Sequence, residues 1–238
     1  MTPLVLVHGF MGGSEQWNLQ APLAKDRELI AIDLPGFGKN AHKDALRSIP
    51  EFAEWVLAEV GTEQFDLLGH SMGGMIAQEM IRLAPDRVCK LLLYATGAEG
   101  VIPGRFEPIE TSIRRARADG AKSVARRITA TWFLDTEAAQ EFPACAKIAE
   151  ASTLQAIIAG LEAMQIWSGI AHLEKIALPT LVLWGDRDRT YSWSQTETLW
   201  RNIPDCRIAV LPACAHAVHL ESPLLFNQLV SDFLEANS

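Results

Sequence analysis

The stretch Gly69-His70-Ser71-Met72-Gly73-Gly74 decides the fold that this chain is expected to adopt. It follows the apolar residues 65–68 and opens a helix-forming segment that ends near Ala84. When a Gly-x-Ser-x-Gly pattern joins a strand to a helix, the turn is so tight that the residues two before and two after the serine must lack side chains. Such a turn exposes the serine hydroxyl beside helix N–H groups, which favour negative charge. On its own, a Gly-x-Ser-x-Gly pattern is more often a flexible turn. Here the apolar segment before it and the helix-forming segment after it favour the tight turn.

Short apolar runs alternate with longer amphipathic segments along the chain. The apolar runs are typical of strands covered on both faces of a sheet. They are Leu4–Val7, Leu29–Asp33, Phe65–Gly69, Val88–Ala95, Thr180–Trp184 and Arg207–Leu211. The segments with helical spacing are Trp17–Ala24, Ile49–Val60, Ser71–Ala84, Tyr191–Asn202 and Pro223–Ala236. This alternation predicts an α/β fold with a parallel sheet and right-handed crossover connections.

One long interval, from Glu99 to Ile176, breaks the alternation because it is helix-forming and contains no convincing strand. It lies between two expected strands, on the side of the sheet where Ser71 would emerge. We therefore expect a core domain made of residues 1–98 and 177–238, and a helical lid made of residues 99–176. A helical appendage packed elsewhere is the alternative interpretation.

Composition and charge narrow the classes of partner. The chain has 238 residues, 49% of them hydrophobic, which is enough for one well-packed core. Its net charge of -8, without any run of like charges, argues against nucleic acids and anionic membrane surfaces as partners. It has neither a span of roughly 20 apolar residues nor a basic region before the first apolar run, so we expect a cytoplasmic protein. The four cysteines lack metal-ligand spacing and are expected to be reduced, with a Cys206–Cys214 disulfide as the alternative.

A serine hydroxyl is a poor nucleophile unless a base takes its proton and a third group fixes the tautomer of that base. Two downstream loops supply such groups. Gly185-Asp186-Arg187-Asp188 follows one expected strand, and Cys214-Ala215-His216 follows the next. Serine, acid and base occur in this chain order when the serine stands on a strand-to-helix turn. We therefore expect Ser71, Asp188 and His216 to act together as nucleophile, acid and base.

With these motifs in this order, the chain resembles the α/β-hydrolase family, in particular its small capped serine esterases, over essentially its whole length. The resemblance implies a mostly parallel sheet of about six strands flanked by helices, with the helical lid inserted before the penultimate strand. Family members usually begin with an antiparallel hairpin, which is missing here because the first strand begins almost at Met1. The Leu29–Asp33 strand should therefore lie at an edge of the sheet.

The resemblance also implies roles for individual acidic residues and histidines. It makes Asp188 the acid, as the second aspartate of a Gly-Asp-x-Asp turn, and leaves Asp186 to brace the loop. His216 matches the base of a Gly-His-x-x-x-x-Glu-x-Pro pattern, although Ala215 replaces the glycine. The competing histidine, His219, is expected to point outward or to contact the lid.

Two further motifs match the family. His8-Gly9-Phe10 resembles its oxyanion loop, which implies that the backbone N–H groups of Phe10 and Met72 bind the developing oxyanion. Each such donor lowers the barrier by roughly 3 kcal/mol. The run Asp33-Leu34-Pro35-Gly36-Phe37-Gly38 has a structural role in the family, and Asp33 is the alternative to Asp188 as the acid.

Candidates for substrate binding come from the turn and from the lid. His70 is expected to pack beside the serine or to contact substrate. Aromatic and sulfur-bearing lid residues at helical spacing form the lid core or line an apolar acyl pocket, with Trp132 and Trp167 as candidates beside Phe133 and Met164. Between positions 105 and 127 of the lid the charged residues are mostly basic: Arg105, Arg114, Arg115, Arg117, Lys122, Arg126 and Arg127 against Glu107, Glu110 and Asp119. They form a solvated helix face, or some of them, with Arg114 and Arg126 as candidates, bind a carboxylate or a phosphate-bearing acyl carrier.

The resemblance implies hydrolysis of carboxylic esters of small-molecule or carrier-linked acyl substrates through an acyl-enzyme, without metal or organic cofactor. An acyl carrier protein is a candidate partner, no nucleic acid or membrane partner is expected, and the oligomeric state is left open. The alternatives within the family are enol-lactonases, lyases of the menaquinone type and C–C hydrolases of ring-cleavage products. The C–C hydrolases are disfavoured because His70 and Ala217 replace their usual asparagine and tryptophan. A non-catalytic ligand receptor would keep the same residues around a lidded pocket.

Overall fold

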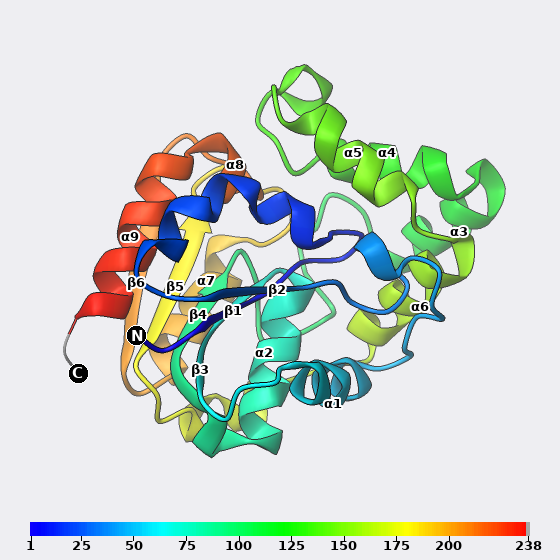
Figure 1. Cartoon of the computed structure of the whole chain (residues 1–238). Helices are drawn as coiled ribbons and strands as arrows, with labels where there is room; N and C mark the ends of the chain where they lie inside the picture. The colour runs from blue at the N-terminus through cyan, green and yellow to red at the C-terminus, as the bar shows by residue number, and fades with distance from the viewer. Residues whose placement is uncertain (237–238) are drawn as a thin grey trace.

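A six-stranded, fully parallel sheet forms the centre of the structure, which is a computed structural model that describes residues 1–236 (Figure 1). The strands lie in the order β2-β1-β3-β4-β5-β6, and each neighbouring pair is parallel. Their bounds are β1 Leu4–Val7, β2 Leu29–Ile32, β3 Phe65–His70, β4 Val88–Tyr94, β5 Thr180–Gly185 and β6 Cys206–Leu211. The predicted α/β fold is confirmed, and the second strand lies at an edge as predicted.

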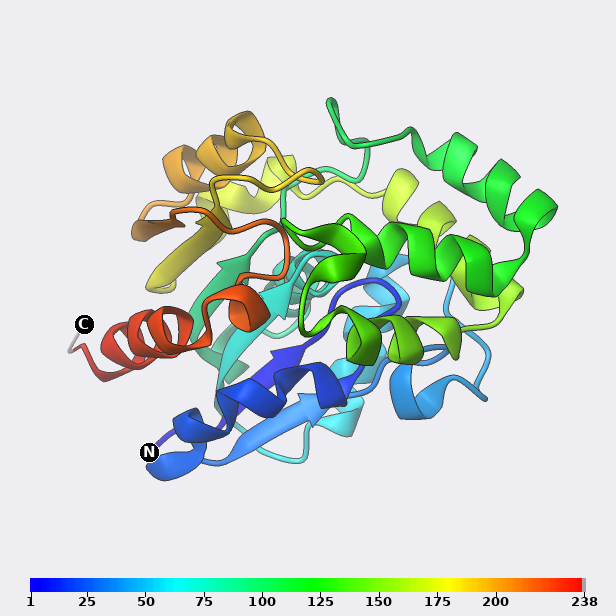
Figure 2. The same ribbon diagram turned by 90° about the horizontal axis from the view of Figure 1, so that it is seen from above.

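Helices cover both faces of the sheet because successive strand side chains point to opposite sides. Val5, Val7 and Leu67 pack toward α1 (Ile49–Glu59), α2 (Met72–Leu83) and α7 (Trp193–Asn202). Leu4, Leu6 and Leu68 pack toward η1 (Ser14–Lys25), α8 (Val218–Glu221) and α9 (Pro223–Glu235). In Figure 2 the sheet is seen between α9 on one side and α7 on the other. Short 3-10 turns, η2 (Gly38–Asn40) and η3 (Pro85–Arg87), complete the core.

One predicted helical segment and two predicted strands differ from expectation for local reasons. The segment expected to be helical from Trp17 to Ala24 forms the 3-10 element η1, which contains Pro22, a residue without the N–H that an α-helix needs. Strands β2 and β6 are only partly buried, and Val210 of β6 is 45% exposed. The prediction that every strand is covered on both faces is therefore wrong for these two edge strands.

The segment between β4 and β5, residues 99–176, is an insertion whose helices α3 to α6 gather at one end of the sheet in Figure 1, while its last turn, η5, returns past the end of α2. Its two ends lie antiparallel: Gly100 donates from its N–H to Trp167 O at 2.9 Å, and Gly169 donates to Ala98 O at 2.8 Å. These bonds join the beginning and the end of the insertion at its base. Its elements are α3 Ile109–Asp119, α4 Ala121–Ala130, η4 Thr136–Ala138, α5 Phe142–Glu150, α6 Leu154–Gln165 and η5 Ile170–Lys175.

No single helix within residues 1–236 is long and apolar enough to cross a membrane, and α5 with α6 meets that test only as a pair bent by 99°. All four cysteines are free thiols, so the alternative of a Cys206–Cys214 disulfide is not realised.

Candidate active site

Ser71 stands on the tight turn between β3 and α2. Its backbone has φ 55° and ψ −118°, a left-handed conformation that is strained for a residue with a side chain. Added Cβ atoms at the flanking glycines would lie 2.3 Å from Gly73 O for Gly69 and 2.2 Å from Val7 O for Gly73. Only glycine fits at these two positions, and this close packing holds the serine at the carboxyl end of β3.

His216 and Asp188 form a buried pair next to this turn. His216 Nδ1 lies 2.9 Å from Asp188 Oδ2, and the two side chains are 2% and 0% exposed. The other carboxylate oxygen accepts hydrogen bonds from the N–H groups of Thr190 (2.7 Å) and Tyr191 (3.2 Å). Because Nδ1 donates to the carboxylate, Nε2 of a neutral His216 carries no proton and can act as a base. Ser71 and His216 line the same pocket, without a Ser71 Oγ–His216 Nε2 hydrogen bond in the described structure.

The other two aspartates considered have different partners. Asp33 Oδ1 accepts from the N–H groups of Ser14 (2.9 Å) and Lys39 (3.1 Å) and so shapes the loop after β2. Burial alone would raise the pKa of Asp33, but these hydrogen bonds bring it below its usual value. Asp186 is partly exposed, with its carboxylate 3.8 Å from the side chain of Arg187. Of the three aspartates, only Asp188 contacts His216.

His8 holds the loop that contains Phe10. Its Nε2 accepts from the Leu34 N–H at 3.0 Å, and its Nδ1 donates to Gly9 O at 2.7 Å. Burial lowers the pKa of His8 to about 4, so the ring is neutral and fits both hydrogen bonds. The Phe10 N–H enters no hydrogen bond among residues 1–236. The Met72 N–H is the first in α2 and has no acceptor within the helix.

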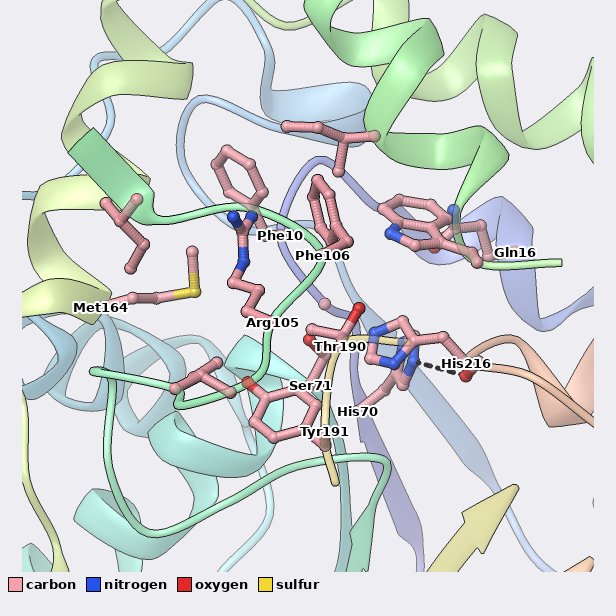
Figure 3. A pocket seen from close by; sticks show the side chains of 15 residues that line it. Phe10, Gln16, His70, Ser71, Arg105, Phe106, Met164, Thr190, Tyr191 and His216 are labelled. Atoms are coloured by element: carbon pink, nitrogen blue, oxygen red, sulfur yellow. Dashed lines mark hydrogen bonds between the residues drawn. The ribbon is translucent and has the colours of Figure 1, made fainter. Parts of the chain in front are cut away.

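A buried aromatic cluster supports the backbone of His216. Its carbonyl oxygen accepts from the Tyr94 hydroxyl at 2.8 Å and from His70 Nε2 at 3.3 Å, the contact dashed in Figure 3. The His70 ring stacks on Tyr94 with centroids 4.5 Å apart. Burial, followed by the nearby His216, lowers the pKa of His70 well below its usual value. His70 thus both packs beside the serine and lines the pocket.

His219 belongs to the same cluster, so the expectation that it points outward or contacts the lid is wrong. It is 2% exposed, its Nδ1 lies 3.0 Å from the Tyr94 hydroxyl, and its ring lies 4.8 Å from that of Trp17. Helix α8 is a single turn packed beneath η1, which directs this side chain inward. Burial lowers the pKa of His219 to about 3, so it is uncharged at neutral pH.

Hydrogen bonds fasten the insertion to the loops that carry His216 and Asp188. The Glu221 carboxylate accepts from the N–H groups of Ala215 (2.6 Å) and Leu134 (2.7 Å). Arg189 donates to Leu134 O at 3.1 Å, and Ala217 donates from its N–H to Trp132 O at 2.9 Å. The segment Trp132–Leu134 is therefore bonded to both loops and closes one side of the pocket.

The pocket over Ser71 is mostly apolar and contains about 480 Å³ of space outside protein atoms, part of it open to solvent. Most of its apolar lining comes from the insertion: Ile102, Phe106, Ile109, Ile128, Trp132 and Met164. Phe10, His70, Tyr191 and Gln16 come from the core, and Arg105 brings a positive charge (Figure 3). Of the residues predicted to bind substrate, the structure brings His70 and Trp132 to this pocket.

The structure does not bring the other three predicted residues to this pocket. Trp167 donates from Nε1 to the buried Glu79 carboxylate at 2.9 Å and so anchors the end of the insertion to α2. Arg126 is paired with Glu137 at 2.6 Å on the surface, and Arg114 is exposed on α3. The buried positions of α3 are Ile109, Ser112 and Ala116, so Arg114 points to the other side of that helix. Arg114 and Arg126 therefore lie on a solvated helix face, as in the first of the two interpretations of the basic residues.

Sequence reasoning did not select Arg105 and Tyr191 as pocket residues. Tyr191 was expected to begin a helix, but α7 begins at Trp193, and Tyr191 is buried with its ring stacked on His216 at 5.8 Å. Its position three residues after Asp188 is the sequence feature that could have placed it at the site. Arg105 was one of seven basic residues between positions 105 and 127, and nothing in its spacing distinguished it from the rest.

Comparisons with known proteins agree with the fold. The model of the "Alpha/beta hydrolase family" matches residues 4–229. A Pseudomonas putida protein, the dihydrolipoyllysine-residue acetyltransferase component of an acetoin cleaving system, is 30% identical over 98% of this chain, which spans 63% of that protein's length. The pimeloyl-[acyl-carrier protein] methyl ester esterase of Yersinia enterocolitica is 27% identical, with 99% of this chain and 94% of that protein covered.

A solved structure gives the same picture at the level of the fold. The enol-lactonase of Burkholderia xenovorans LB400 superimposes with a TM-score of 0.89 at 23% identity, with 99% of this chain and 92% of that chain covered. The matched sheet, the tight serine turn and the family model over nearly the whole sequence lead to one assignment. The chain belongs to the α/β-hydrolase family.

Proposed function

We propose that this protein is a serine hydrolase that cleaves carboxylic esters of small-molecule or carrier-linked acyl substrates through an acyl-enzyme. The observation that carries the proposal is the buried His216–Asp188 pair, 2.9 Å apart, which shares a pocket with the strained Ser71. A strained serine beside a histidine whose tautomer is fixed by a carboxylate is the arrangement that nucleophilic catalysis requires. Ser71, His216 and Asp188 are the nucleophile, the base and the acid.

In the first half of the reaction, His216 Nε2 removes the proton from Ser71 Oγ as the oxygen attacks the ester carbonyl. The Asp188 carboxylate stabilises the imidazolium that forms. The N–H groups of Phe10 and Met72 bind the oxyanion, and His216 then gives its proton to the departing alcohol. In the second half, His216 removes a proton from water, which attacks the acyl-enzyme and releases the acid and Ser71.

The buried cluster under His216 supports this mechanism. Burial keeps His70 and His219 neutral, so neither adds a positive charge next to the imidazolium of His216. The hydrogen bonds from Tyr94 and His70 to the His216 carbonyl fix the backbone that carries the base. A base that must reach both the serine and the leaving oxygen benefits from such a fixed position.

We also propose that residues 99–176 act as a lid over a core made of residues 1–98 and 177–238. The insertion supplies most of the apolar pocket lining and is bonded to the loops of both Asp188 and His216. A lid of this kind excludes water from the acyl-enzyme until the pocket opens. The methyl ester esterase relative supports carboxylic esters as the substrate class.

Hydrolysis of p-nitrophenyl butyrate tests the proposal. We expect turnover by the wild-type protein and loss of about a thousandfold or more for Ser71→Ala, since removing the nucleophile leaves only binding and the oxyanion site. Ser194→Ala, a change at an exposed serine on α7, is the matched control and should leave kcat/KM unchanged. Turnover that is equal in wild type and Ser71→Ala would contradict the proposal.

A further inference from the structure

Arg105 is the only basic side chain of the inserted segment among those that line the pocket with Ser71 and His216 in the described structure. It precedes α3, and its Nη1 donates to Glu107 O at 2.6 Å and to Ser112 Oγ at 3.1 Å. Its guanidinium lies 4.2 Å from the centre of the Phe106 ring. These contacts fix the position of the side chain without neutralising its charge.

The nearest carboxylate, that of Glu107, is already shared by two other arginines. Glu107 Oε1 lies 3.0 Å from Arg127 Nη1 and accepts from Ser112 Oγ at 2.5 Å, and Oε2 lies 3.0 Å from Arg115 Nη1. The Glu107 carboxylate is therefore paired with two guanidinium groups, while Arg105 contacts only the backbone carbonyl of that residue. Arg127 Nη2 is also buried without an acceptor among residues 1–236. The three arginines and Glu107 together therefore carry a net positive charge, and not every N–H donor among them has an acceptor.

Arg105 is half-buried. A partly desolvated cation without its own counterion is unfavourable, because desolvation is not offset by an ion pair. Burial accordingly lowers the pKa of Arg105, although a guanidinium stays charged at neutral pH. The desolvation cost of Arg105 is offset when a ligand brings an anion into the pocket. Such a planar donor group suits a carboxylate, which can accept two parallel hydrogen bonds.

The position of Arg105 indicates which half of an ester would carry the anion. In Figure 3 its side chain projects among Phe10, Phe106 and Met164, on the opposite side of Ser71 from His216. His216 must protonate the leaving alcohol, so the alcohol lies on the His216 side. The acyl group then extends past apolar side chains toward Arg105.

We propose that the pocket selects esters whose acyl group ends in a carboxylate, the half-esters of aliphatic dicarboxylic acids, and that Arg105 binds this carboxylate. The inference rests on the proposed function, since it takes Ser71 as the nucleophile and His216 as the acid for the leaving group. It adds the substrate class and the residue that recognises it.

The test compares monomethyl adipate with methyl hexanoate, which have acyl chains of equal length and differ in the terminal carboxylate. Hydrolysis is followed by base uptake at constant pH for the wild type, Arg105→Gln, Arg105→Lys and Arg117→Gln. We expect the wild type to prefer the charged ester. Arg105→Gln should lower the ratio of the two kcat/KM values by about tenfold or more, mainly through KM, as expected for a lost charge-assisted hydrogen bond.

The other two variants serve as controls. Arg105→Lys keeps the charge but loses the planar donor group, so its ratio should fall between those of wild type and Arg105→Gln. If Arg105→Gln fails to fold, Arg105→Lys takes its place, and a ratio equal to that of wild type contradicts the inference. Arg117 is exposed on α3, and Arg117→Gln should keep the wild-type ratio. A fall as large as that of Arg105→Gln would assign the effect to general lid charge and overturn the role of Arg105.

The outcomes separate the inference from the proposed function. If Ser71-dependent hydrolysis of both esters occurs without preference for monomethyl adipate, or if Arg105→Gln keeps that preference, the inference is wrong and the proposed function stands. If neither ester is hydrolysed, the proposed function fails for methyl esters, and calorimetry with adipate decides the inference alone. Adipate binding that Arg105→Gln weakens by about tenfold supports the inference, and no binding overturns it.

Discussion

The hydroxyl of Tyr94, at the end of β4, donates a hydrogen bond of 2.8 Å to the backbone carbonyl of His216. This bond connects the middle of the sheet to the loop that carries the proposed base. Tyr94 is fully buried, and its oxygen also accepts from the His219 N–H at 3.2 Å. The position of the imidazole is therefore set by a residue that does not line the pocket.

Tyr94→Phe should weaken both stability and catalysis. The change leaves two buried groups of His219 without an acceptor, so we expect a loss of about 1–3 kcal/mol in the free energy of unfolding. The His216 carbonyl keeps only the longer hydrogen bond from His70, so kcat should fall more than KM changes. Urea unfolding and steady-state kinetics measure the two effects. A stability loss with unchanged kcat would mean that Tyr94 has no positioning role.

Asp188→Asn should nearly abolish activity with little change in fold. The amide cannot stabilise the imidazolium and favours the wrong His216 tautomer, so we expect kcat to fall by about four orders of magnitude. Asp186→Asn is the matched control two residues away, because that carboxylate is partly exposed and does not contact His216. Equal effects of the two changes on ester hydrolysis would contradict the role of Asp188.

Gly73→Ala should destabilise the protein more than an alanine at a glycine in open space. A Cβ at Gly73 would lie 2.2 Å from Val7 O, whereas a Cβ at Gly61 would meet no atom within 4 Å. Overpacking of this kind costs about 1–3 kcal/mol or more, while Gly61→Ala should be neutral or slightly stabilising. Denaturant unfolding of both variants measures the difference. Equal stability of Gly73→Ala and wild type would show that the turn can open.

Stability should fall as the pH drops from 7 to about 5. Burial lowers the pKa of His8 to about 4 and of His219 to about 3, and lowers that of His70 in the same direction. Below about pH 6.5 the unfolded chain therefore binds protons that the folded protein does not, and each such histidine adds a slope of up to about 1.4 kcal/mol per pH unit.

The histidine contribution is measured from unfolding free energies at several pH values. His219→Gln should reduce the slope between pH 6.5 and 5, and His42→Gln, at an exposed position, should leave it unchanged. Stability that is constant from pH 7 to 5 would contradict neutral burial of these rings.

The fold was predictable because a parallel sheet covered by helices needs uninterrupted apolar runs. All six predicted strands coincide with β1 to β6 to within one residue at each end. The edge strands show the limit of this reasoning, because the apolar residues of β6 do not reveal that Val210 has no helix over it. Coverage depends on where the helices pack, and a strand's own residues do not encode that.

Part of the site was predictable for a similar reason. Ser71, Asp188 and His216 each follow a strand, and the carboxyl ends of parallel strands meet at one edge of the sheet. The insertion was not predictable at this level, since its helices pack according to tertiary contacts. Arg105 and Arg114 both belong to its basic set, yet one lines the pocket and the other is exposed.

The most direct measurement of the central claim is the site of covalent labelling by a p-nitrophenyl alkylphosphonate. We expect one phosphonyl group per chain, which peptide mass mapping locates on Ser71, with release of one p-nitrophenol and loss of ester hydrolysis. His216→Ala should slow the labelling strongly, because the serine then lacks its base. A label on any other residue, or rapid labelling of the Ser71→Ala variant, would contradict Ser71 as the nucleophile.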